Sequence, residues 1–139
     1  EKPGNIGAVV RSADGAGMDA LIVADPSTDL YNPNAIRASL GAIFKMPMAE
    51  AASEPVLEWL VKNDFQVVAA RVDGSVPYTD IDFRRPTALV LGSEATGLSS
   101  VWSGPRITAA RLPMLGVGDS LNVSTAAAVL FYEARRQRG

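Results

Sequence analysis

Two residue types that carry much of enzyme chemistry are missing from the 139-residue chain, which has no cysteine and no histidine. The absence of cysteine excludes disulfides, thiolate metal sites and a cysteine nucleophile. The absence of histidine excludes a Ser-His-Asp triad, a histidine general base and histidine-ligated zinc. We therefore expect no metal, and any catalysis must rely on Arg, Lys, Asp, Glu, Ser, Thr, Tyr or Asn side chains.

Long apolar runs are missing as well. Apolar residues make up 47% of the chain but come in short runs such as Ala20 to Ala24. These fall far below the ~18 consecutive residues typical of a membrane span. Residues 1–5 do not resemble a secretory signal. We expect one compact domain that acts in the cytoplasm and does not bind or cross a membrane.

An excess of positive charge is also absent. Lys and Arg number 13 against 15 Asp and Glu, and the pI is about 5.1. Because a free-standing nucleic-acid-binding domain usually has a basic footprint, this balance counts against RNA as a partner and has to be explained.

Helical and strand patterns alternate along the chain. Helices are expected over 6–13, 36–43, 54–63 and 122–138, and strands over 20–24, 45–51, 65–70, 86–91 and 107–112. Asn32 or Asn34 is a plausible cap for the second helix. The run 86–91 is typical of a strand covered on both faces. The alternation predicts an α/β domain with a mostly parallel sheet and helices on both faces.

A glycine-bearing turn from Leu91 to Ser99 follows the expected strand 86–91. Open α/β sheets bind ligands at the carboxyl ends of strands. Gly92 and Gly97 would let the backbone approach a ligand closely. An ordinary turn with an exposed Glu94 explains the local pattern equally well.

A second glycine-bearing loop, 113–119, leads into the closing helix. Ser120 or Asn122 could cap this helix, and free N–H groups there could meet a ligand. A plain helix start explains the same residues. Gly116-x-Gly118 lacks the third glycine of a dinucleotide motif, and neither a P-loop nor a Gly-x-Ser-x-Gly elbow occurs.

Asn5 and Arg11 stand near the start of the chain. On one helix they would lie about 240° apart around the axis and would not share a face. That constraint relaxes if Asn5 precedes the helix. By itself, an arginine on a helix is more often a solvated surface charge than a functional residue.

Taken together and in order, three segments resemble the motifs of the SpoU (TrmH-like) family of RNA ribose methyltransferases, within the SPOUT superfamily. The segments are residues 5–13, 89–99 and 112–124, so the likeness spans nearly the whole chain. The resemblance implies an α/β domain whose C-terminal part is tucked through a loop as a trefoil knot, an exception to the general absence of knots.

The resemblance also implies a cofactor and a set of site residues. S-adenosylmethionine would be held largely by backbone, and the implied cofactor-binding residues are Leu91, Gly92, Glu94, Gly97, Leu112, Met114, Leu121 and Asn122. Arg11 is the implied catalytic residue, with Asn5 and Glu94 supporting the site and Ser120 and Asn122 positioning substrate or cofactor. Because a guanidinium is very hard to deprotonate, we interpret Arg11 as a phosphate clamp and electrostatic stabiliser.

Partners follow from the same resemblance. The substrate would be structured RNA, ribosomal rather than transfer RNA, methylated at a ribose 2′-hydroxyl. Family members form homodimers through their knot regions, so that motif one of one subunit completes the site of the other. We expect the dimer face on the last helix, around Ala127, Leu130 and Phe131. An enzyme that methylates a base, or a non-catalytic RNA-binding module of the same fold, remains an alternative.

Family members usually carry an RNA-binding domain or extension ahead of motif one, whereas this chain has four residues before Asn5. We therefore expect residues 1–139 to be a SpoU-type catalytic domain without that region, which would explain the acidic balance. The remaining basic residues form either a local patch or a scatter of solvated charges. They are Arg11, Arg37, Arg84, Arg85, Arg135, Arg136 and Arg138.

Overall fold

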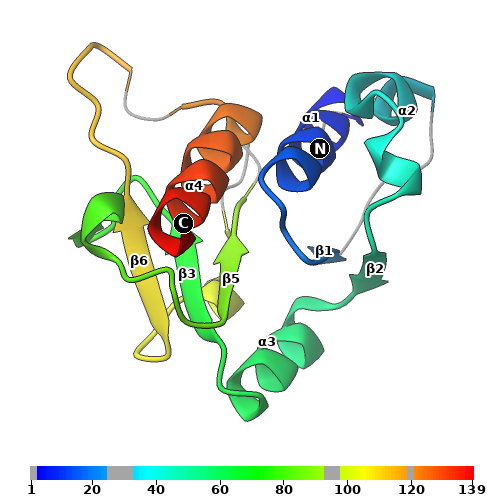
Figure 1. Cartoon of the computed structure of the whole chain (residues 1–139). Helices are drawn as coiled ribbons and strands as arrows, with labels where there is room; N and C mark the ends of the chain where they lie inside the picture. Colours follow the sequence, from blue (N-terminus) through cyan, green and yellow to red (C-terminus); the bar gives the residue numbers. More distant parts are fainter. Residues whose placement is uncertain (1–2, 25–32, 93–97, 119–120) are drawn as a thin grey trace.

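The computed structural model describes residues 3–24, 33–92, 98–118 and 121–139 (Figure 1). The helices are α1 (Pro3–Gly15), α2 (Pro33–Ser39), α3 (Ser53–Lys62) and α4 (Val123–Arg138), with 3₁₀ turns η1 (Ala42–Phe44), η2 (Tyr78–Asp80) and η3 (Ser100–Trp102). The strands are β1 (Leu21–Ala24), β2 (Met48–Ala51), β3 (Gln66–Ala70), β4 (Val76–Pro77), β5 (Thr87–Val90) and β6 (Ile107–Arg111).

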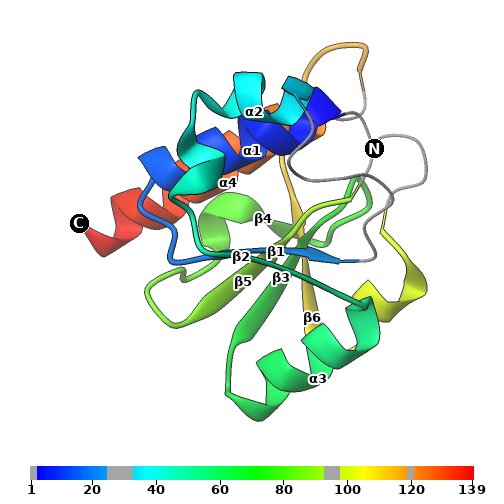
Figure 2. The same ribbon diagram turned by 90° about the vertical axis from the view of Figure 1, so that its right-hand side faces the viewer.

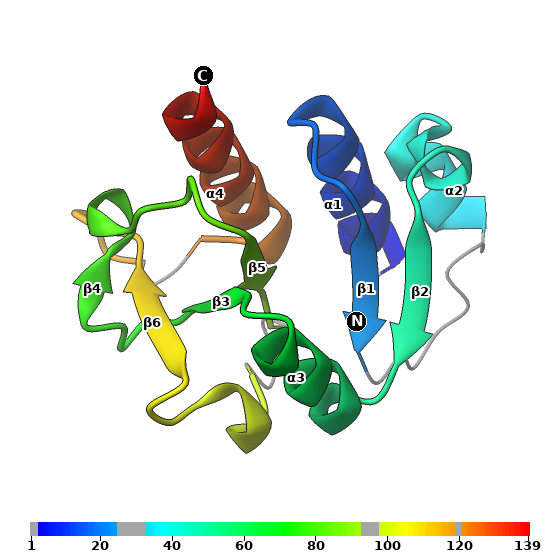
Figure 3. The ribbon, with the colours of Figure 1, turned by 60° about the horizontal axis from the view of Figure 1, so that its bottom comes forward.

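The strands form two parallel sheets. One pairs β1 with β2, and the other has the order β4-β6-β3-β5. Helices α1, α2 and α4 cover one side and α3 the other (Figure 2). Figure 3 shows β1 and β2 beside the larger sheet, with α1 and α2 near the first pair and α4 over the second. The predicted α/β architecture is confirmed.

Two expected elements differ in detail. The helix expected over 36–43 is divided, because Leu40 and Gly41 have positive φ values of 52° and 86° between α2 and η1. The backbone turns there before a second helical turn begins. The strand expected over 86–91 is shorter, spanning Thr87–Val90 at the edge of its sheet, but both of its faces are covered as expected. Leu89 packs against the clusters that α4 helps to form, and Ala88 and Val90 pack against the cluster of α3.

The expected capping residues have different outcomes. Asn34 lies inside the first turn of α2, where its side chain accepts a hydrogen bond from Arg37, so it is not the cap. Asn32 lies outside the described residues.

Helix α4 is buried on the side that was expected to form a dimer. Ala127 and Phe131 pack with Val10 of α1, while Leu130 packs with Val68 of β3. The exposed fractions of Ala127, Leu130 and Phe131 are 0%, 0% and 4%. The predicted dimer face was therefore wrong: helical periodicity identified an apolar face, but the chain's own core covers it.

The C-terminal turn of α4 is fastened to the segment ahead of β5. The Gln137 amide donates to the Ile81 carbonyl at 2.9 Å and accepts from the Phe83 N–H at 2.7 Å. Arg138 donates to the carbonyls of Phe83 and Arg85 at 2.8 and 2.9 Å. The last helix thereby holds the entry to β5 in place.

No helix among the described residues has both the length and the apolar character that crossing a membrane requires. The same residues hold no group of three or more acidic side chains placed to bind a metal ion.

Gly7 determines how closely α1 and α2 pack. A Cβ at this position would contact the Ala35 carbonyl oxygen and lie 2.6 Å from the Ala38 Cβ. Contacts this short between backbone and small side chains cannot be relieved by a rotamer change. The glycine in the first motif is therefore explained by helix packing.

Gly7→Val should lower the free energy of unfolding by about 1–3 kcal/mol or more, because α1 must move away from α2. Urea titration followed by circular dichroism measures the effect. Gly116→Val is the matched control, since a Cβ there meets nothing within 4 Å. Equal stability of the two variants would show that the helices separate without cost.

Candidate functional site

Two of the expected ligand-binding segments leave the same edge of the larger sheet. Leu91 and Gly92 follow β5, and Leu112 follows β6. Both strands run parallel to β3, which lies between them, so their carboxyl ends share one edge. Leu91 and Leu112 are half-buried and pack against the same core cluster. The structure thus brings these two segments of the sequence together.

The N-terminus of α4 follows the second of these loops. Asn122 has a non-helical backbone, and its Oδ1 accepts from the Ser124 N–H at 2.9 Å and from the Ser124 hydroxyl at 2.5 Å. The capping expected of Asn122 is confirmed, and one of the free N–H groups of the helix is satisfied. Leu121 just before it is half-buried.

The loop between β6 and α4 exposes large apolar side chains. Leu115 is 99% exposed and Val117 is fully exposed, whereas Met114 is half-buried. Leu115 and Val117 lie two positions apart on this loop, so their apolar surface is available for contact with a partner. The remaining predicted site residues, Glu94, Gly97 and Ser120, lie outside the described residues.

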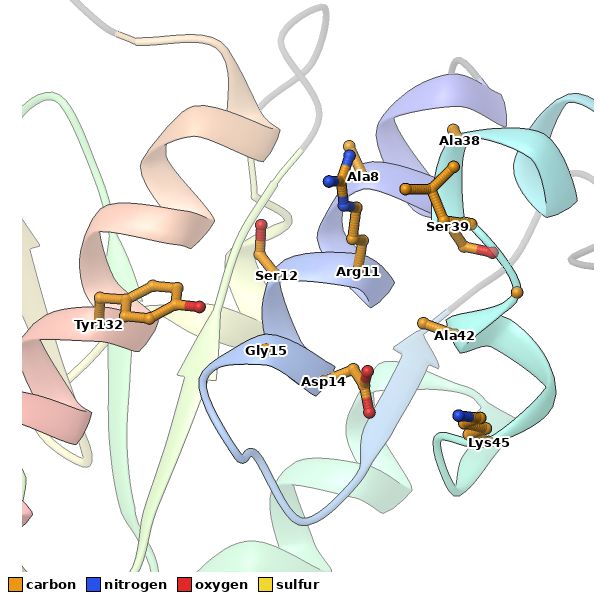
Figure 4. A pocket seen from close by; sticks show the side chains of 12 residues that line it. Ala8, Arg11, Ser12, Asp14, Gly15, Ala38, Ser39, Ala42, Lys45 and Tyr132 are labelled. Carbon is orange, nitrogen blue, oxygen red and sulfur yellow. The ribbon is translucent and has the colours of Figure 1, made fainter.

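Arg11 lines a separate groove of about 580 Å³ between α1, the turn that leads into η1, and α4 (Figure 4). Its side chain is exposed, and it forms no hydrogen bond or ion pair with any residue that the structure describes. The groove is lined by Ala8, Arg11, Ser12, Asp14, Gly15, Ala38, Ser39, Leu40, Gly41, Ala42, Lys45 and Tyr132. Within one chain, Arg11 is therefore not grouped with Leu91 and Leu112.

Asn5 lies within α1, which begins at Pro3. Asn5 and Arg11 are on the same helix, so the possibility that Asn5 precedes it was wrong. Six helical positions place the two residues on different faces. Asn5 is half-buried, whereas Arg11 is exposed.

The turn from Ser39 to Ala42 lines the Arg11 groove and was not foreseen as part of a site. The Ser39 hydroxyl is buried, donates to the Ile36 carbonyl at 2.9 Å and accepts from the Ile43 N–H at 3.4 Å. Leu40 is 71% exposed with positive φ, which is uncommon for a branched side chain. The signal in the sequence was Gly41 after a helical pattern, typical of a helix end.

The seven basic residues do not gather into one patch. Arg84 pairs with Asp82 at 2.9 Å and lowers the pKa of that carboxyl to about 2. Arg136 pairs with Glu133 at 2.8 Å and, with Gln137, lowers the pKa of Glu133 to about 2.

Two more of the seven basic residues form hydrogen bonds with other groups of the chain. Arg37 contacts Asn34, and Arg138 binds backbone carbonyls. Arg11 and Arg135 make no such contact within the described residues.

Comparisons with known proteins all point to one family. The model of the SpoU rRNA methylase family matches residues 1–132. A 23S rRNA (uridine(2479)-2′-O)-methyltransferase of Streptomyces viridochromogenes is 37% identical over 142 residues, which cover 98% of this chain and 50% of the relative. The chain spans about half the length of the curated relatives it matches.

Solved structures give the same result. One described as an RNA 2′-O ribose methyltransferase has 43% identity and a TM-score of 0.89. The match covers 99% of this chain and 53% of the chain in that structure. The SpoU methyltransferase AviRb from Streptomyces viridochromogenes, in complex with the cofactor AdoMet, has 36% identity and a TM-score of 0.90. That match covers 99% of this chain and 57% of the AviRb chain.

Proposed function

Because the chain belongs to the SpoU rRNA methylase family, we propose that it transfers a methyl group from S-adenosylmethionine to a ribose 2′-hydroxyl of structured RNA, and of ribosomal RNA in particular. The observation that carries the proposal is the convergence of Leu91 and Leu112 at the carboxyl edge of the sheet. Ligands of open α/β sheets bind at this edge. Relatives named as 2′-O-methyltransferases favour a ribose over a base as the target.

The residues at this edge fit the cofactor. Leu91, Leu112, Met114 and Leu121 are half-buried apolar side chains suited to an adenine ring, and Gly92 admits a ligand close to the backbone. Asn122 stands at the start of α4. Glu94, Gly97 and Ser120 belong to the proposed site through their motifs. The cofactor, when bound, supplies a methyl group on a positively charged sulfur.

Arg11 would act through charge and position. An exposed guanidinium can hold an RNA phosphate with two parallel hydrogen bonds and bring a ribose hydroxyl into line with the methyl group. It would also stabilise charge that develops on the oxygen. The hydroxyl proton leaves to an RNA phosphate, to Glu94 or to water, while Asn5 and Ser120 support the substrate.

A homodimer would unite the two surfaces. Arg11 and the strand-edge residues line different parts of one chain, so the Arg11 groove of one copy would have to face the strand edge of the other. Leu115 and Val117 would become buried in such a contact. Two-fold symmetry would then create two equal sites, each made from both copies.

The trefoil knot is supported by the strand order. β6 comes last in the sequence but enters between β3 and β4, after which α4 packs back over the sheet. Threading of the C-terminal part through the preceding loop would produce this order. We infer that residues 1–139 are the knotted catalytic domain of the protein.

Gly92→Trp should weaken S-adenosylmethionine binding by at least about tenfold, which is ~1.4 kcal/mol, because an indole would fill the space next to the backbone. Isothermal calorimetry measures the affinity. Glu58→Trp adds the same bulk on the exposed side of α3 and should leave the affinity unchanged. Equal binding by both variants would move the cofactor away from the carboxyl end of β5.

Arg11→Ala should lower turnover by about 10²–10³-fold with little change in cofactor affinity, because a fixed charge at the reacting oxygen is lost. Arg11→Lys should keep part of the activity, since a positive charge remains although the pair of parallel hydrogen bonds is lost. Methyl transfer to RNA is followed by radiolabel. Wild-type turnover of Arg11→Ala would make this residue a surface charge only.

Mixing the Arg11→Ala and Gly92→Trp variants tests whether the copies share sites, when activity is assayed at a cofactor concentration too low to fill the Gly92→Trp site. After unfolding and refolding together, Arg11→Ala and Gly92→Trp should regain about a quarter of wild-type activity, because half of the dimers are mixed and each of these has one intact site. Failure to regain activity, with dimers present by light scattering, would place Arg11 and the cofactor within one subunit.

A further inference from the structure

Lys45 lines the same groove as Arg11, on the opposite side from α4 (Figure 4). It follows η1, and its backbone N–H donates to the Ala42 carbonyl at 2.9 Å, so its position is fixed by the turn. The side chain is exposed and forms no ion pair with the described part of the chain. This cation lies outside the three motifs.

Arg135 reaches α1 from the other side. The Arg135 Nη1 lies 3.5 Å from the place of a Cβ on Gly17, and the Tyr132 hydroxyl lies 2.8 Å from that on Gly15. The guanidinium is therefore next to the C-terminal end of α1, where the helix dipole favours a positive charge. Arg135 is exposed and has no ion-pair partner among the described residues.

Together these residues give α1 a cationic surface in an acidic chain. Arg11 stands on the helix and Lys45 lines the same groove (Figure 4), while Arg135 lies next to Gly17, just after the end of the helix. Asp14 is the one carboxylate among the groove's lining residues, and it forms no ion pair with them. Unpaired cations around a groove complement the negative charges of a nucleic-acid backbone.

We propose that Lys45 and Arg135 bind phosphates of the substrate RNA on the two sides of the nucleotide held at Arg11, an inference that rests on the proposed function. Such contacts set the register of the RNA on the protein without reading its bases. They would also explain how a chain with a net charge of −2 binds RNA: the cations concentrate on one surface while other basic residues are neutralised locally.

The salt dependence of binding tests this directly. A fluorescein-labelled single-stranded oligouridylate is titrated with the protein at several KCl concentrations. The slope of log K against log salt is negative, and for single strands each lost phosphate contact makes it less steep by about 0.7. Lys45→Ala and Arg135→Ala should each lose about that much, and the double variant about twice as much. Lys45→Arg should keep the wild-type slope.

Lys62→Ala is the matched control, because Lys62 is an exposed cation on α3, across the sheet. Its slope should equal that of the wild type. Thermal melting and calorimetry with S-adenosylmethionine confirm that each variant is folded and keeps its cofactor site. Wild-type slopes for Lys45→Ala and Arg135→Ala would overturn the proposal, and so would a loss of dimer mass without a change of slope.

Failure of the phosphate contacts can be distinguished from failure of the proposed methylation. Radiolabel transfer to RNA by the wild-type protein tests methylation, whereas the slopes test the phosphate contacts. Methylation with unchanged slopes rejects only the roles of Lys45 and Arg135. A wild-type protein that binds oligouridylate with the expected slopes but transfers no methyl group would reject the proposed function instead.

Discussion

Helix α4 holds the two halves of the domain together. Its buried face joins two clusters, one containing Val10 of α1 and the other Val68 of β3. Each large side chain buried there contributes about 1.5–3 kcal/mol. The Asn122 cap fixes its first turn, and Gln137 and Arg138 fix its last turn to the segment before β5. One helix thus positions both the strand edge and the α1 surface.

Local patterns in the sequence were sufficient for most of the elements and for one cap. The alternation of apolar runs and helical spacing predicted the α/β order, and Asn122 was among the expected caps. Arg11 was expected on an early helix, where it is exposed. These features depend on residues close to one another in the chain, so periodicity and capping chemistry are informative about them.

Features that depend on distant segments were missed or misjudged. Periodicity showed that Ala127, Leu130 and Phe131 share an apolar face but not that α1 and β3 cover it. The edge position of β5 depends on strand order, which no local pattern contains. Lys45 was not predicted as a site residue, because it lines the same groove as Arg11 only once η1 packs beside α1.

A chain without histidine or cysteine can still accelerate a reaction through position and fixed charge, and the proposed methyl transfer from a sulfonium suits these means. The most direct test incubates the protein with S-adenosylmethionine carrying an isotope-labelled methyl group and ribosomal RNA from a strain lacking the gene. The RNA is then digested to nucleosides for mass spectrometry. We expect the label on ribose, in a single kind of 2′-O-methyl nucleoside. Label on a base, or no label with cofactor bound, would contradict the proposed function.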